Sequence, residues 1–125
     1  MPGTPPVRLS FPRSRRIKKS GDFARARAQG KRFICGCLIA NLRLLPPGAT
    51  SRLGVVTSKR VGGAVARNRA RRLLRESFRL HQHDLPQAAD VVLVARPSIA
   101  GKGFAAVERD FLRAMSQVRT GAAKP

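Results

Sequence analysis

The side chains most able to take part in binding chemistry are arginine guanidinium groups concentrated in one short stretch. Residues 58–81 read SKRVGGAVARNRARRLLRESFRLH and contain one acid, Glu76. A guanidinium is planar and permanently charged, and it binds a phosphate through two parallel hydrogen bonds. Like charges four residues apart on a helix, as at Arg67, Arg71 and Arg75, repel one another. The stretch therefore predicts a surface for a polyanion, and the alternative is a solvated basic face with no particular partner.

The charge of the whole chain indicates the same partner. Lys and Arg number 26 against 6 Asp and Glu, a formal net charge of +20. Such a balance implies nucleic acid or an anionic membrane, bound through phosphate contacts and counterion release. No apolar run approaches the roughly 20 residues that span a bilayer, and the N-terminus lacks the apolar segment of a secretory signal. We therefore expect a cytoplasmic, nucleic-acid-binding protein without a membrane partner.

The acidic and sulfur-containing residues form no catalytic pattern. No two acids pair as a general acid and base or as a metal cage, and no nucleophile or phosphate-loop motif is present. Cys35 and Cys37 are two apart on an expected strand, far in sequence from His81 and His83, and a zinc site needs a fuller ligand set. We expect free thiols, with a disulfide or metal site as the minor alternative, and no catalytic or metal-binding residue in this chain.

The basic residues are expected to lie on one long helix. A glycine pair, Gly62 and Gly63, precedes an uninterrupted run of good helix formers, which predicts a helix from about Ala64 to about His81. At about 100° per residue, its apolar stripe comprises Ala66, Ala70, Leu73, Ser77 and Leu80, widened by Leu74 and Phe78. The opposite side comprises Asn68, Arg71, Arg72, Arg75 and Arg79.

The sequence before the basic helix predicts an arm, a short helix and strands. Residues 1–19 form a basic, Pro- and Arg-rich arm, expected to be flexible, with Phe11 its one docking apolar residue. Ser20 is expected to cap a helix from Gly21 to Gln29. From residue 31 to residue 45 the apolar residues alternate, which predicts one strand or two around a break.

The sequence after these strands completes one domain over residues 20–119. A strand over Leu53–Ser58 is expected as an antiparallel neighbour of the alternating stretch. The apolar run Asp90–Ala95 is typical of a strand covered on both faces. A last helix is expected to bury the stripe Phe104, Val107, Phe111, Met115 and Val118. Residues 120–125 are expected to be a disordered tail.

The stretch SKRVGGAVARNRARRLLRESF has a specific order: a strand ending in a basic pair, a Gly-containing turn, and an R-N-R core on a helix. It closely resembles the signature of the protein subunit of bacterial ribonuclease P. Arg67, Asn68 and Arg69 match the core, and Arg72 matches the basic residue three positions on. The resemblance extends more weakly from about Phe11 to about Arg119.

The resemblance implies a particular fold. It is an α+β sandwich in αβββαβα order, similar to domain 2 of ribosomal protein S5, with a left-handed crossover. Without the resemblance, the strand–helix–strand unit from Leu53 to Ala95 would be expected to cross over in the right-handed sense. The expected handedness therefore rests on the resemblance alone.

The resemblance also implies an activity that needs no catalytic residue here. In ribonuclease P the catalytic component is an RNA, and Mg²⁺ held mainly by that RNA and the substrate activates the water that cuts precursor tRNA. The cut releases the 5′ leader. The protein subunit of this endonuclease binds the catalytic RNA and the leader, and it strengthens metal-dependent substrate binding. No obligate protein partner is implied.

Two RNA-binding surfaces follow from the resemblance. The catalytic-RNA surface comprises Lys59, Arg60, Arg67, Asn68, Arg69, Arg71, Arg72 and Arg75. The leader surface comprises Phe23, Arg27, Ile39, Asn41 and Arg43. Phe23 stands where the family places an aromatic that stacks on a base, with core packing as an equal alternative. Arg27 stands where a second aromatic often occurs.

Two other classes of function compete. A structural RNA-binding protein, such as a ribosomal protein or an RNA chaperone, fits the composition equally well, and only the R-N-R block with its flanking strand order favours ribonuclease P. A DNA-binding helix is a poorer match, because nothing resembles the bracing helix of a helix-turn-helix. The aromatic-rich strand of the RNA-recognition sheet is also missing.

Overall fold

The computed structural model describes residues 16–17, 20–46, 48–82 and 88–120. Its elements are α1 (Ser20–Gln29), β1 (Lys31–Cys35), β2 (Leu38–Leu44), β3 (Arg52–Val56), α2 (Ala64–His81), β4 (Ala89–Ala95) and α3 (Phe104–Thr120). Single turns of 3-10 helix, η2 (Lys59–Val61) and η4 (Pro97–Ile99), precede α2 and α3. The αβββαβα order expected from the sequence is confirmed.

The four strands form one sheet in the order β1-β2-β4-β3. β2 is antiparallel to both β1 and β4, whereas β3 pairs with β4 in parallel. The expectation that β3 lies beside the alternating stretch is therefore wrong. β4 takes the place between them because its side chains are almost all buried, and a central strand is covered on both faces. The alternating stretch is two strands, with Gly36 at φ 58° in the turn between them.

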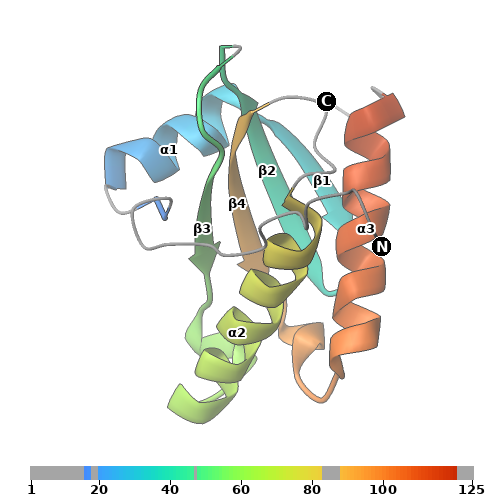
Figure 1. The fold of residues 1–125 in the computed structure, drawn as a ribbon. Helices are drawn as coiled ribbons and strands as arrows, with labels where there is room; N and C mark the ends of the chain where they lie inside the picture. Colours follow the sequence, from blue (N-terminus) through green and yellow to red (C-terminus); the bar gives the residue numbers. More distant parts are fainter. Residues whose placement is uncertain (1–15, 18–19, 47, 83–87, 121–125) are drawn as a thin grey trace, which may run out of the picture.

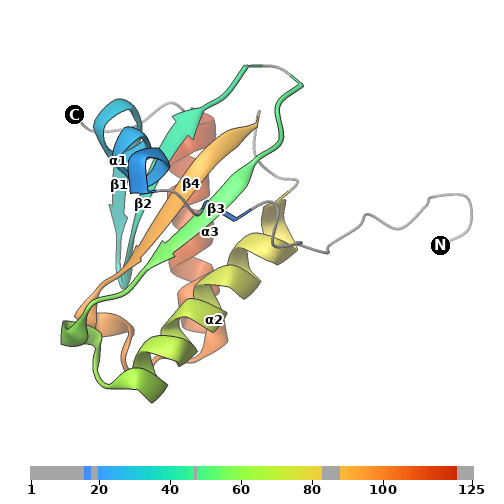
Figure 2. The ribbon, with the colours of Figure 1, turned by 90° about the vertical axis from the view of Figure 1, so that its left-hand side faces the viewer.

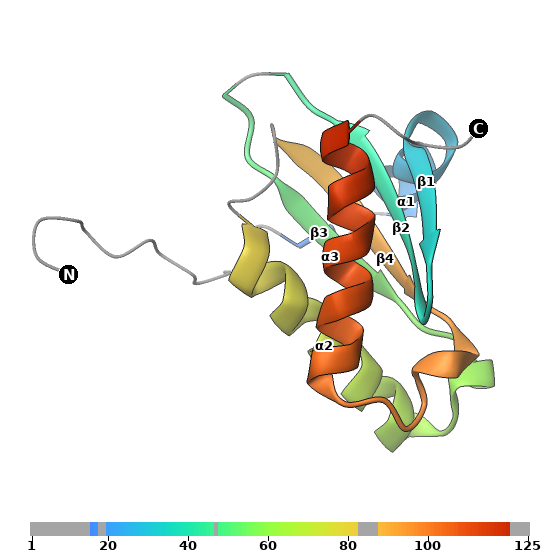
Figure 3. The same cartoon turned by 90° about the vertical axis from the view of Figure 1, so that its right-hand side faces the viewer.

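The connection from β3 through α2 to β4 is a left-handed crossover. Seen from the helix side with both strands running downward, as in Figure 3, β4 lies to the right of β3 and α2 passes in front. A right-handed unit would place β4 on the left. Since about 98% of such crossovers are right-handed, this is a distinctive property of the fold.

The sheet separates two layers (Figures 1 and 2). α2 and α3 pack on one face and enclose the main core, while α1 lies over part of the other face. The large core side chains include Phe33, Leu38, Leu53, Leu74, Phe78, Leu93, Ile99 and Phe111. The rings of Phe78 and Phe111 meet edge to face with centroids 6.4 Å apart, which joins α2 to α3. The expected core stripe of α3 is confirmed at Val107, Phe111 and Met115.

The N-terminal segment contributes to the fold through a residue that the sequence reasoning missed. Ile17 is 5% exposed and packs with Val92 on the α1 side of the sheet. Its N–H donates to the Leu53 carbonyl oxygen at 2.8 Å, so the segment continues the sheet beyond the edge of β3. The expectation that Phe11 is the one docking residue of the arm is wrong, because Ile17 docks. Phe11 itself lies outside the described residues. Of the expected tail 120–125, Thr120 is instead the last residue of α3, and residues 121–125 lie outside the described part of the chain.

The two thiols match the expectation of free cysteines. Both are buried and neither forms a disulfide. Burial, together with the hydrogen bond to Asp110, raises the pKa of the Cys37 thiol to about 12. Cys37 is therefore not a reactive thiolate at neutral pH. No helix within the described ranges is long and apolar enough to cross a membrane.

Candidate nucleic-acid interface

A tight turn sets where the basic surface begins. Ser58 accepts a hydrogen bond from the Arg60 N–H at 3.3 Å, and this closes η2 with Lys59 and Arg60 exposed. Gly62 follows at φ 142°, and a Cβ there would lie 2.8 Å from that of Ala66. Only glycine fits this approach without strain. The turn therefore places the basic pair directly before the first turn of α2.

Two arginines of α2 are positioned by contacts within the protein. Arg71 donates to Thr57 Oγ1 at 2.7 Å and also to the Asn68 side-chain oxygen. Arg69 donates to the Lys102 carbonyl oxygen at 2.7 Å, which ties α2 to the loop before α3. These bonds engage only part of each guanidinium, since each carries five N–H donors. The remaining donors stay available on an already ordered side chain.

Arg67, Arg72 and Arg75 have no comparable hydrogen bond to the described part of the protein. Asn68 and Arg72 are exposed, while Arg67 and Arg75 are half-buried. The Nε of Arg67 is buried and has no hydrogen-bond partner among the described residues. Burial lowers the pKa of Arg75, and the nearby Arg16 and Arg71 lower it further. Positive charge is thus concentrated along this face beyond what its protein neighbours balance.

Glu76, the one acid of α2, does not neutralise this face. Arg79, one turn beyond Arg75, donates from its Nε to Glu76 Oε1 at 2.9 Å. The hydrogen bond with Arg79 is the main reason that the pKa of Glu76 is lowered. The carboxylate is committed to Arg79 at neutral pH, which leaves the arginines before it for an external anion.

A second candidate surface lies on the face of the sheet that α1 covers in part. Arg32, Ile39, Asn41 and Val94 line a hollow of about 260 Å³. Alternate residues of a strand share a face, so Ile39, Asn41 and Arg43 point to one side of β2. This is the side covered by α1, because Gln29 of α1 contacts Arg43. Ile39 is half-buried and Asn41 is buried, so the floor combines apolar surface with an amide.

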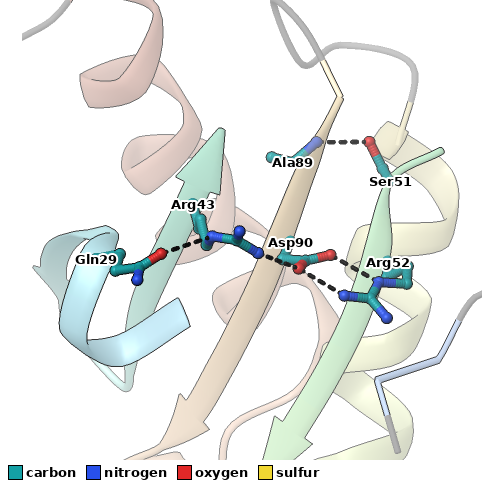
Figure 4. Close-up of polar contacts among 6 residues, drawn as sticks. All are labelled: Gln29, Arg43, Ser51, Arg52, Ala89 and Asp90. Atoms are coloured by element: carbon teal, nitrogen blue, oxygen red, sulfur yellow. Dashed lines mark hydrogen bonds and ion pairs between the residues drawn. The ribbon is translucent and has the colours of Figure 1, made fainter. Parts of the chain in front are cut away.

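Arg43 takes part in a polar row across three strands (Figure 4). Its Nε donates to Gln29 Oε1 at 3.1 Å, and its Nη1 lies 3.4 Å from Asp90 Oδ2. Arg52 binds the same carboxylate from the other side: its Nε donates to Asp90 Oδ1 at 2.9 Å and its Nη2 donates to Oδ2 at 2.8 Å. Arg43 therefore has a structural partner as well as a place beside the predicted leader residues.

The structure leaves part of the predicted leader surface undefined. Phe23 and Arg27 lie on α1 four residues apart, which places them on one side of that helix. Their side chains fall outside the described part of the chain, so base stacking and core packing of Phe23 both stay predictions. The structure adds Arg32 and Val94 to Ile39 and Asn41. Sequence reasoning missed both, because Arg32 reaches this face through its pairing with Asn41, and Val94 through its pairing with Ile39.

These surfaces can be compared with known proteins. The family model described as Ribonuclease P matches residues 11–119 of the chain. The chain belongs to the ribonuclease P protein family. Within that family, the "Ribonuclease P protein component" of Desulfovibrio desulfuricans is 41% identical over 90 residues, which cover 71% of this chain and 69% of that protein. The component of Brevibacillus brevis is 31% identical over 107 residues, covering 86% and 85%.

Solved ribonuclease P proteins share the fold. The Staphylococcus aureus RNase P protein superposes with a TM-score of 0.74 at 26% identity, covering 82% of this chain and 93% of that one. The Thermotoga maritima RNase P protein gives a TM-score of 0.71 at 26% identity, covering 82% and 96%. The sandwich expected from the R-N-R resemblance is thus the architecture of the ribonuclease P family.

The described residues contain no cluster of side chains that could bind a metal ion. No three of its His, Cys, Asp and Glu side chains there come together as a potential cluster. His81 is 2.8 Å from Glu108, but this pair joins α2 to α3. Asp90 is committed to two arginines.

Proposed function

We propose that this chain is the RNA-binding protein subunit of ribonuclease P, assisting a catalytic RNA in removing the 5′ leader from precursor tRNA. The observation that carries the proposal is the outer face of α2, where arginines lie beside a single acid that is already paired. Family membership supports the same role. As a subunit of that enzyme the chain would act in the cytoplasm and need no second protein.

The catalytic-RNA surface is proposed to run from η2 along α2. Its residues are Lys59, Arg60, Arg67, Asn68, Arg69, Arg71, Arg72 and Arg75. The ordered guanidinium groups of Arg69 and Arg71 lose less conformational entropy on binding than free side chains would. The buried Nε of Arg67 gains most from an anionic acceptor. A phosphate backbone supplies such acceptors at regular intervals.

The leader surface is proposed to be the hollow on the α1 side of the sheet. Ile39 and Val94 offer apolar contact to a base, while Asn41 and Arg32 offer polar groups at its edge. Phe23, Arg27 and Arg43 complete the proposed set. Stacking of a base on an aromatic ring contributes roughly 1–3 kcal/mol and tolerates any base, which suits a leader of variable sequence.

Catalysis is assigned to the RNA partner. Mg²⁺ would be held by that RNA and by the substrate, and no acid of this chain would take part in the cleavage step. The protein reduces repulsion between phosphates of the RNA and of the substrate, and it holds the leader. Tighter substrate binding at low Mg²⁺ is the expected consequence, because protein charge substitutes for part of the cation atmosphere.

The test is cleavage of a precursor tRNA that bears a 5′ leader by a bacterial ribonuclease P RNA at low Mg²⁺. Reactions with this protein are compared with reactions without protein and with another small basic protein. Stimulation by this protein alone is expected. Equal stimulation by the control would mean that only net charge acts, and a general RNA-binding role would replace the proposed one.

A further inference from the structure

Helix α1 has little apolar surface with which to hold its place on the sheet. Its ten residues, SGDFARARAQ, include one large apolar side chain, that of Phe23. Isolated helices of this length are marginal in water, so α1 depends on contacts with the rest of the fold. A Phe23 ring that stacks on a base of the leader cannot also be buried in the core. The proposed leader surface therefore needs another contact that fixes α1 against the sheet.

Gln29, the last residue of α1, supplies such a contact (Figure 4). Its side-chain oxygen accepts a hydrogen bond from Arg43 Nε at 3.1 Å. The donor is a guanidinium, and a hydrogen bond from a charged donor is stronger than one between neutral groups. Gln29 is exposed, so its side chain takes no part in core packing. The contact can therefore be removed without opening a cavity in the core.

Arg43 is itself held from the side opposite Gln29. In the strand register, Asp90 of β4 lies directly opposite both Arg43 on β2 and Arg52 on β3. Arg52 binds both oxygens of the carboxylate, at 2.9 and 2.8 Å, and Arg43 Nη1 lies 3.4 Å from Oδ2. The Asp90 side chain has no exposed surface, so the sheet sets its position. A row of polar contacts thus runs from β3 across the sheet to α1.

This row borders the hollow of the proposed leader surface. Asn41, which lines the hollow, is two residues before Arg43 on β2. Residues two apart on a strand share a face and are separated by about 7 Å. The side chain of Arg43 is 30% exposed, and its contacts with Gln29 and Asp90 engage Nε and Nη1. The residues that fix the end of α1 therefore lie directly beside the hollow.

We propose that Gln29 is a positioning residue for the leader, acting through Arg43, whose guanidinium Asp90 holds in place. The contact fixes the C-terminal end of α1 beside the hollow, and with it the side of the helix that carries Phe23 and Arg27. Gln29 need not touch RNA. Without it, ordering of α1 and Arg43 would cost conformational entropy when the leader binds. Anchoring of α1 is independent of the proposed function, whereas its effect on the leader rests on that function.

The first experiment measures hydrogen exchange of the α1 amides in the full chain without RNA. Gln29→Ala is expected to exchange about fivefold faster there, because one anchoring hydrogen bond is lost. Gln29→Glu is expected to keep the protection of wild type, since a carboxylate also accepts from Arg43. Gln117→Ala removes the same side chain from α3, on the other face of the sheet, and is expected to leave α1 unchanged. Unchanged α1 exchange in Gln29→Ala, or no rescue by Gln29→Glu, would overturn the proposal.

The second experiment measures equilibrium binding of precursor tRNA with a 5′ leader and of mature tRNA to the holoenzyme. Gln29→Ala is expected to weaken precursor binding about fivefold and to leave mature tRNA binding unchanged. In an Arg43→Ala background, where Arg52 still pairs with Asp90, Gln29→Ala is expected to cause no further loss, because residues that act through one contact are not additive. Equal losses on both RNAs, or additive losses in the double variant, would overturn the effect on the leader.

The two experiments separate this inference from the proposed function. A wild-type holoenzyme that bound precursor and mature tRNA equally would rule out the leader surface, and with it the effect of Gln29 on the leader. The exchange rates of α1 would still decide whether Gln29 anchors the helix.

Discussion

Asp90 is completely buried in the sheet, and arginines from both neighbouring strands face its carboxylate. Arg52 binds both oxygens and Arg43 reaches one of them. A buried carboxylate is tolerated only where such partners replace its hydration. From the sequence Asp90 was an ordinary residue at the start of a strand. The strand register makes it the centre of a network that ties β2 and β3 to β4.

Asp90→Asn is expected to destabilise the protein by about 3 kcal/mol, because it replaces a completely buried carboxylate, bound by two partly exposed arginines, with a neutral amide. Urea unfolding followed by circular dichroism measures the change. Glu76→Gln is the matched control, since Glu76 pairs with Arg79 at the partly exposed surface of α2. The Glu76→Gln variant is expected to lose no more than about 1 kcal/mol of unfolding free energy. Similar losses of unfolding free energy in the two variants would show that Asp90 contributes no more to stability than a surface ion pair.

At the scale of elements, a carboxylate of α3 holds the β1–β2 hairpin. Asp110 Oδ2 accepts the Cys37 N–H at 3.0 Å. Gly36 lies so close that a Cβ there would stand 2.2 Å from the same oxygen. The turn therefore needs both a glycine at positive φ and an acid on the facing helix. Neither residue lies in the motif that carried the family resemblance.

This contact makes part of the stability depend on pH. Burial alone would raise the pKa of Asp110, but the hydrogen bonds from the Cys37 N–H and thiol, helped by Arg109 and Arg113, outweigh it and lower the pKa. A lowered pKa in the folded state means that the stabilisation is full above the unfolded pKa of about 3.9 and is lost as pH falls through the folded value.

Asp110→Asn is accordingly expected to be less stable than wild type at pH 7, with the difference shrinking below about pH 4. Urea unfolding at a series of pH values from 7 to 3 measures it. Glu108→Gln, on the same helix, is the control for general charge effects. A difference between Asp110→Asn and wild type that stays constant down to pH 3 would contradict the assignment.

α2 contains arginines of two kinds, and they should respond differently to substitution. Arg72→Ala is expected to leave the melting temperature unchanged, because the side chain is exposed, while weakening binding to ribonuclease P RNA and lowering its salt slope by about one unit. Arg69→Ala should also lower the melting temperature, since Arg69 bonds the Lys102 carbonyl. Filter binding over a range of salt concentrations measures the slope. An unchanged slope for both variants would remove α2 from the RNA interface.

At the scale of the whole molecule, the sheet separates the two proposed RNA surfaces. The hollow lined by Ile39 and Asn41 lies on the face of the sheet where α1 contacts β2. Figure 2 shows α1 and the basic helix α2 on opposite sides of the sheet. One small domain can thus contact the catalytic RNA and the leader at the same time. Substitutions on the two surfaces are expected to act additively, because distant sites share no partners.

Phe23→Ala tests the leader side of this arrangement. It is expected to weaken binding of leader-bearing precursor tRNA by roughly 1–3 kcal/mol in the holoenzyme, with little effect on mature tRNA, because only the precursor supplies a base to stack. Equilibrium binding of both RNAs gives the comparison. Equal losses, accompanied by a lower melting temperature, would place Phe23 in the core.

The local patterns of the sequence determined much of this description. The bounds of α2 follow from a glycine pair and a run of helix formers, the buried stripe of α3 from a period of 3.6 residues, and β4 from a continuous apolar run. Each of these signals lies within the element itself. The net charge indicated a polyanionic partner, and the resemblance carried by the R-N-R block implied that this partner is RNA. The break at Gly36 was also visible, although not whether it separated two strands.

Contacts between residues far apart in the chain determined the strand order and the side-chain clusters that depend on it. The sequence placed β3 beside β2, whereas the structure inserts β4 between them, because the most buried strand gains most free energy at the centre of the sheet. The docking of Ile17 and the arginines around Asp90 both depend on that strand order. Neither leaves a periodic signal, because each pairs residues far apart in the chain whose proximity exists only after the sheet has assembled.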